Sequence, residues 1–75
     1  MISYKNLSGN SGVVAYELGA NYIKVRFNGS RKIFVYDATA PGLPHVERMK
    51  QLATAGRGLA KYISQNVKRN YARIE

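Results

Sequence analysis

Basic and aromatic side chains alternate along residues 22–27, where Tyr22, Lys24 and Arg26 stand at every second position. Single-stranded nucleic acid is typically held by cations that follow its backbone and by aromatic rings that stack on its bases. Arg31 and Lys32 follow shortly afterwards in the chain. We therefore predict that these five residues bind RNA or single-stranded nucleic acid on one face of a sheet. Alternatively, Tyr22 covers the edge of the core and the cations keep an exposed strand soluble and unpaired.

A second group of cations lies near the end of the chain, at Lys61, Lys68 and Arg69. On a helix they would extend the positive field of the first group or form an ordinary solvated face. Arg57 stands between two glycines at the expected start of that helix, where free backbone N–H groups could hold a phosphate. A flexible turn between two helices explains the same glycines.

Net charge favours an anionic ligand. The chain has 12 Lys and Arg against 4 Asp and Glu, which gives a net charge of +8 and a pI near 10.1. Such a balance suggests attraction to nucleic acid, to an anionic membrane or to an acidic protein. The alternative is a charge that serves solubility.

Residues that could support catalysis are few and scattered. The four acids, Glu17, Asp37, Glu47 and Glu75, fall in different predicted elements, so a pair of carboxylates for acid–base catalysis is not expected. His45 is the only histidine and the chain has no cysteine. A lone imidazole is a weak metal ligand or base, and we expect it to be an exposed residue of a first helical turn. The sequence therefore predicts no enzyme, no metal and no cofactor.

Three strands are predicted, at about residues 13–18, 22–27 and 31–36. The first alternates Val14, Tyr16 and Leu18 with Val13, Ala15 and Glu17. In the second, Ile23, Val25 and Phe27 should face the core. Asn28 and Gly29 between the last two strands predict a type I′ hairpin turn, which needs positive φ at both residues.

The register of this hairpin stays open at the level of sequence. A two-residue loop puts Val25 opposite Lys32, and a four-residue loop puts it opposite Phe34. Both registers turn Phe34 and Tyr36 toward the core. A three-residue loop with a bulge would turn them onto the opposite, basic face.

Two helices should follow, at about residues 44–55 and 58–71. The first has Pro44 in its opening turn, Gly56 after its end, and a buried stripe of Val46, Met49, Leu52 and Ala53. The second buries Leu59, Ile63 and Val67. The whole chain, 1–75, is predicted to be one α+β domain, with 1–12 a loosely ordered lead-in anchored by Ile2 or Tyr4.

No apolar run approaches the roughly 20 residues that span a bilayer, and residues 1–12 lack the apolar centre of a signal peptide. We therefore expect a cytoplasmic protein of bacterial or mobile-element type, without a membrane partner.

Three short motifs carry a resemblance to a known family. The second strand reads Ile23-Lys24-Val25-Arg26-Phe27, the third holds Phe34-Val35-Tyr36, and Val67-Lys68 is followed by Tyr71. With these motifs the chain resembles the KTSC domain family, named for the C-terminus of some lysyl-tRNA synthetases and also found as free-standing bacterial or phage proteins. The chain departs from the family pattern in having Phe34 in place of a tyrosine and a long loop at 37–43.

The resemblance implies a fold of three strands and two helices and a role in RNA binding. The motif residues Phe34, Tyr36, Val67 and Tyr71 are expected in the core rather than at the site. A second hypothesis is a protein-interaction or accessory subunit, in which the half-covered strand 33–36 binds an acidic partner or a second copy of the chain.

Overall fold

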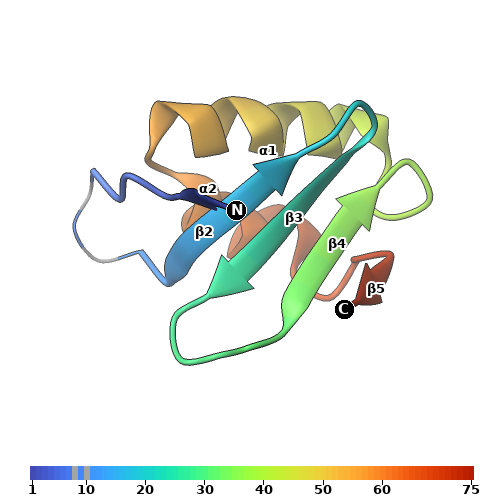
Figure 1. Cartoon of the computed structure of the whole chain (residues 1–75). Helices are drawn as coiled ribbons and strands as arrows, with labels where there is room; N and C mark the ends of the chain where they lie inside the picture. The colour runs from blue at the N-terminus through green and yellow to red at the C-terminus, as the bar shows by residue number, and fades with distance from the viewer. Residues whose placement is uncertain (8, 10) are drawn as a thin grey trace.

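A computed structural model describes residues 1–7, 9 and 11–75 of the chain. Over these residues an antiparallel sheet of five strands runs in the order β1-β2-β3-β4-β5, so that neighbouring strands follow one another in sequence. The strands are β1 (Ile2–Ser3), β2 (Val13–Leu18), β3 (Tyr22–Phe27), β4 (Ile33–Asp37) and β5 (Arg73–Ile74). In the sequence, β4 and β5 are separated by α1 (Leu43–Ala55), α2 (Leu59–Tyr62) and the π-helical turn η1 (Ile63–Val67). Figure 1 shows α1 and α2 together with the sheet. The predicted α+β class is confirmed.

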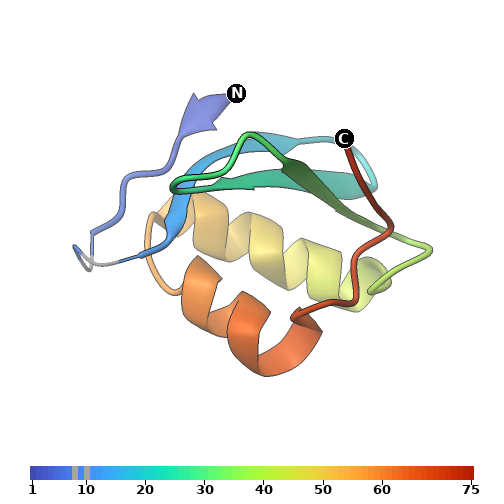
Figure 2. The same cartoon turned by 90° about the horizontal axis from the view of Figure 1, so that it is seen from below.

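The helices lie together on one face of the sheet (Figure 2). The predicted stripe of α1 is buried at Val46, Met49 and Ala53, with Leu52 half-buried. The core joins these residues to side chains from the three long strands and from α2 and η1, among them Tyr16, Ile23, Val25, Tyr36, Leu59, Ile63 and Val67. Hydrophobic burial of both helices against one sheet face therefore holds the fold together.

The predicted sheet of three strands is incomplete, because a short strand extends it at each edge. Ile2 of β1 lies opposite Tyr16 of β2, and Ile74 of β5 lies opposite Phe34 of β4. A strand of two residues cannot show the alternation by which strands are recognised in a sequence. Both edge strands exist because a neighbouring strand offers them free backbone groups.

Tyr4 ties the start of the chain to the core. Its backbone N–H donates to the carbonyl of Val14 at 3.0 Å, and its hydroxyl accepts a hydrogen bond from the N–H of Leu59 at 3.3 Å. Because Tyr4 is buried and Ile2 is exposed, Tyr4 is the anchor of the lead-in. Two residues of the lead-in lie outside the described part of the chain, Ser8 and Asn10.

The second helix, predicted to run to Tyr71, ends at Val67. At the end of η1 the N–H of Lys68 donates to the carbonyl of Ile63, and Lys68 itself leaves the helical region with a φ of 21°. The chain then returns to the sheet, where the ring of Tyr71 packs edge-on against Phe34 with centroids 5.1 Å apart. These aromatic contacts and the pairing of β5 with β4 replace the last helical turns.

The hairpin between β3 and β4 has the register of the longer loop. Val25 lies opposite Phe34 and Ile23 lies opposite Tyr36. Both aromatic side chains therefore face the helices, Tyr36 fully buried and Phe34 half-buried. The alternative with a bulge, which would have turned them toward the basic face, does not occur.

The predicted type I′ turn is wrong. Gly29 has a φ of 77°, but Asn28 lies outside the left-handed region. Strand pairing resumes only at Ile33, so β4 begins two residues later than predicted. Arg31 and Lys32 consequently belong to the loop at the end of the sheet and not to a strand.

A bulge near the start of β2 changes the predicted alternation. Val13 lies opposite Phe27 and is buried in the core, and Ala15 lies opposite Arg26. Val14 is therefore the extra residue, and Val13 rather than Val14 shares the core side with Tyr16.

Gly56 closes α1 as predicted, and it provides a test of the packing at this end of the fold. It has a φ of 81°, and a Cβ added there would lie 2.6 Å from the Cβ of Lys5. An L-residue in the left-handed region costs about 1–2 kcal/mol, and the contact with Lys5 adds to this cost. We expect Gly56→Ala to lower the free energy of unfolding by about 2 kcal/mol or more in urea titrations.

The matched control is Gly29→Ala in the hairpin loop. Gly29 also has a positive φ, but nothing lies within 4 Å of the added Cβ. This variant should lose only the backbone term of about 1 kcal/mol. Equal losses in the two variants would show that Lys5 moves aside without cost.

Candidate nucleic-acid interface

The three strand residues predicted to bind nucleic acid lie together on the face of the sheet turned away from the helices, called the outer face below. Tyr22, Lys24 and Arg26 alternate with the buried Ile23 and Val25, so their side chains point away from the core. The predicted orientation is therefore correct. What lies beside these side chains decides whether they can hold a ligand.

Lys24 already contacts two carboxylates, one from a residue of β2 and one from the residue that follows β5. Its Nζ lies 2.9 Å from Oε1 of Glu75 and 3.9 Å from Oε2 of Glu17. Glu17 is its direct neighbour across the β2–β3 pair, while Glu75 follows β5. A phosphate could approach Lys24 only in competition with two carboxylates.

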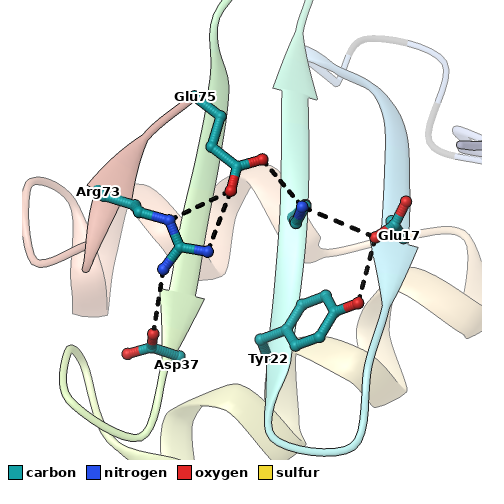
Figure 3. A network of polar contacts seen from close by, with 6 residues as sticks. Glu17, Tyr22, Asp37, Arg73 and Glu75 are labelled. Atoms are coloured by element: carbon teal, nitrogen blue, oxygen red, sulfur yellow. Dashed lines mark hydrogen bonds and ion pairs between the residues drawn. The ribbon is translucent and has the colours of Figure 1, made fainter.

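The network continues on both sides of Lys24. Arg73 contacts Oε2 of Glu75 at 3.0 Å and Oδ2 of Asp37 at 3.8 Å, and the hydroxyl of Tyr22 donates to Glu17 at 3.2 Å (Figure 3). The Nζ of Lys24 also lies 5.7 Å from the centre of the Tyr22 ring. The ring proposed for base stacking thus already carries a cation of the same protein.

These contacts shift the titration of the two central partners in opposite directions. The hydrogen bond from Lys24, followed by that from Arg73, lowers the pKa of the Glu75 carboxyl. The pKa of the Lys24 ammonium is raised, mainly by its hydrogen bond to Glu75 and further by the negative charges of Glu75 and Glu17. Both groups are therefore held in their charged forms, although exposed ion pairs of this kind add little to stability.

Charges of both signs balance on the outer face. Among the described residues it carries three bases, Lys24, Arg26 and Arg73, and three acids, Glu17, Asp37 and Glu75. Val35 lies between Lys24 and Arg73 in the same row of the sheet and is only 1% exposed. The face predicted to be basic therefore has no net charge.

The other nine bases lie elsewhere, with Glu47 as their only acidic counterpart in the sequence, so they account for the whole net charge of +8. Residues 43–69, called the helical layer below, hold six of these bases. Lys50 is paired with Glu47 at 3.2 Å and donates to the carbonyl of Gly19 at 2.9 Å. The remaining five are exposed and take part in no ion pair within the described residues: Arg48, Arg57, Lys61, Lys68 and Arg69.

The predicted site residues thus fall into three places. Tyr22, Lys24 and Arg26 share the outer face, Arg31 and Lys32 are exposed in the loop between β3 and β4, and the rest belong to the helical layer. Sequence reading missed Arg48, whose exposed position on α1 could have been recognised from its place opposite the buried stripe. It also missed Arg73 and the acidic partners of Lys24.

Two further features bear on the site. Asp37, the last residue of β4, also holds the turn that follows, since its carboxylate accepts hydrogen bonds from the N–H groups of Thr39 at 2.9 Å and Ala40 at 3.3 Å. Strand β4, considered for self-association, lies inside the sheet between β3 and β5. Its Val35 and Tyr36 are buried, so this strand does not offer a free surface.

Within residues 1–7, 9 and 11–75 no three side chains of His, Cys, Asp or Glu lie close enough together to hold a metal ion. The same residues contain no helix that is long and apolar enough to cross a membrane.

No family model, no curated protein and no solved structure matches the chain. The resemblance to the KTSC domain family therefore stays a prediction, as does the RNA binding that it implies.

Proposed function

We propose that this protein is a non-catalytic module that binds RNA or single-stranded nucleic acid through its helical layer rather than through the outer face of its sheet. The segregation of charge carries the proposal. The outer face is neutral, and the five exposed bases of the helical layer have no acidic partners among the described residues. The resemblance to the KTSC family implies a ligand of the same class.

The cations of the two surfaces differ in what a phosphate must displace in order to bind them. A phosphate that approaches Lys24 must displace Glu75 and Glu17, whose carboxylates lie within 4 Å. A phosphate that approaches Lys61 or Arg69 displaces only water and counterions, and the release of counterions from the nucleic acid favours binding. Exposed cations without acidic partners also steer an anionic polymer toward the helical layer, which holds five of them.

The test is a titration of a short fluorescent oligouridylate at several salt concentrations. If about five phosphates are contacted, the logarithm of the association constant should fall against the logarithm of salt concentration with a slope of about −3.5. Lys61→Gln with Arg69→Gln removes two contacts. We expect this double variant to bind more weakly and to have a slope smaller in magnitude by about 1.4.

The matched control removes the same charge from the outer face. Lys24→Gln with Arg26→Gln changes the net charge by the same amount, so any difference between the two double variants reports position and not overall charge. We expect the control to bind with nearly wild-type affinity and slope. Absence of binding at low salt would contradict the proposed function, and a larger loss in the control would return the site to the sheet.

A further inference from the structure

Two aromatic rings are held together on the surface of the helical layer. Nδ1 of His45 on α1 and the hydroxyl oxygen of Tyr62 on α2 share a hydrogen bond of 2.6 Å. The ring centroids are 5.9 Å apart and the rings are tilted by 58°. Both residues are half-buried, and Tyr62 also packs against the core, so His45 does not have the exposed position predicted for it. We call these two residues the ring pair.

The other aromatic residues are already committed. Tyr4 and Tyr16 are buried, and the rings of Phe27, Phe34, Tyr36 and Tyr71 pack against one another edge-on beneath the sheet. Tyr22 lies on the neutral outer face, with Lys24 near its ring and Glu17 on its hydroxyl. In residues 43–69 the ring pair contains the only aromatic side chains.

The surroundings of the ring pair match those of a site for single-stranded nucleic acid. Arg48 stands three residues after His45, on the same side of α1. Lys61 is the residue before Tyr62 in α2. Both bases are exposed and lack ion pairs within the described residues. The hydrogen bond that joins the rings satisfies a polar atom of each, so that their remaining exposed surface can contact a base without loss of that bond.

We infer that the ring pair is a stacking platform for an unpaired base, and that the helical layer therefore prefers single-stranded nucleic acid with bases over any other polyanion of the same charge. This inference rests on the proposed function, because the surrounding cations must bring the strand to the rings. Bases in a duplex are stacked on their neighbours and cannot reach such a platform, whereas the bases of a single strand can be splayed onto aromatic rings.

The test compares an oligouridylate with an abasic oligomer of the same length, which has the same phosphates and no bases. The wild-type protein should bind the oligouridylate about tenfold more tightly, as expected for stacking of one base. Tyr62→Leu should remove this preference and leave the affinity for the abasic oligomer unchanged. Tyr62→Phe, which keeps the ring, should retain the preference. Tyr22→Leu on the outer face is the matched control and should also retain it.

The outcomes separate the two proposals. Equal binding of both oligomers by the wild type, or an undiminished preference in a folded Tyr62→Leu variant, would overturn the platform and leave the proposed function in place. Binding of neither oligomer would overturn both. If Tyr62→Leu fails to fold, the wild type still decides the matter by NMR. Oligouridylate should shift the ring protons of Tyr62 and His45 upfield and the abasic oligomer should not, and the absence of such shifts would overturn the platform.

Discussion

Replacing Leu59 with alanine is expected to lower the free energy of unfolding by about 2 to 5 kcal/mol. Leu59 is fully buried at the start of α2, among side chains of both helices and of the sheet. A domain of this length has a total stability of only about 4 to 11 kcal/mol. The cavity left by the truncated side chain should therefore remove a large part of the stability, and it cannot collapse easily because the N–H of Leu59 is held by the hydroxyl of Tyr4.

The measurement is urea unfolding followed by circular dichroism, with Leu7→Ala as the matched control. Leu7 is 64% exposed, so the same truncation should change the stability by no more than about 0.5 kcal/mol. A loss of less than about 1 kcal/mol in Leu59→Ala would mean that α2 contributes little to the core. The second helical segment would then be a loosely attached part of the domain.

Much of the fold follows from local sequence patterns. The alternation of Ile23, Val25 and Phe27 fixes β3 with the predicted bounds, and β2 also begins and ends where predicted. The spacing of Val46, Met49 and Ala53 fixes the buried side of α1, and Gly56 its end. In each case the signal lies within one element, because the burial of one face dictates the period of its apolar residues.

The parts that sequence reading missed depend on contacts between distant elements. Strand β5 forms because the edge of β4 is free and because Tyr71 can pack against Phe34 and Tyr36. These contacts outweigh the helical periodicity that predicted a helix as far as Tyr71. The bulge at Val14 is likewise set by the pairing of β2 with β3, since Val13 is buried opposite Phe27.

The candidate site shows the same division. Alternation predicts correctly that Lys24 and Tyr22 point away from the core. It does not predict that Glu75, 51 residues further along the chain, lies 2.9 Å from Lys24. Charge counted along a strand therefore overstates the charge of the face, since the partners come from other strands. The helical layer escapes this error, because within the described residues its acid, Glu47, is paired with Lys50 on the same helix.

Alkaline pH provides the second large effect, through Tyr36. This residue is 1% exposed. The pKa of its hydroxyl is raised from the ordinary value of 10.0 to about 12, mainly by burial and further by the charge of Tyr71. The folded state therefore keeps the proton at pH values where the unfolded chain has lost it. The resulting contribution to stability is fully present below pH 10 and is lost as the pH rises toward 12.

This difference between the pKa of the folded and the unfolded state corresponds to about 3 kcal/mol, so alkaline pH should destabilise the wild type by that order beyond the loss shared with other groups. Tyr36→Phe keeps the ring and removes the titrating hydroxyl. Urea unfolding of both proteins at increasing pH isolates the effect of the Tyr36 hydroxyl, because every other titratable group is present in both proteins. Between pH 10 and about 12, the free energy of unfolding of Tyr36→Phe should rise relative to that of the wild type. Parallel curves would instead mean that water reaches the Tyr36 hydroxyl, and that the layer formed by Phe34, Tyr36 and Tyr71 opens at alkaline pH before the domain unfolds.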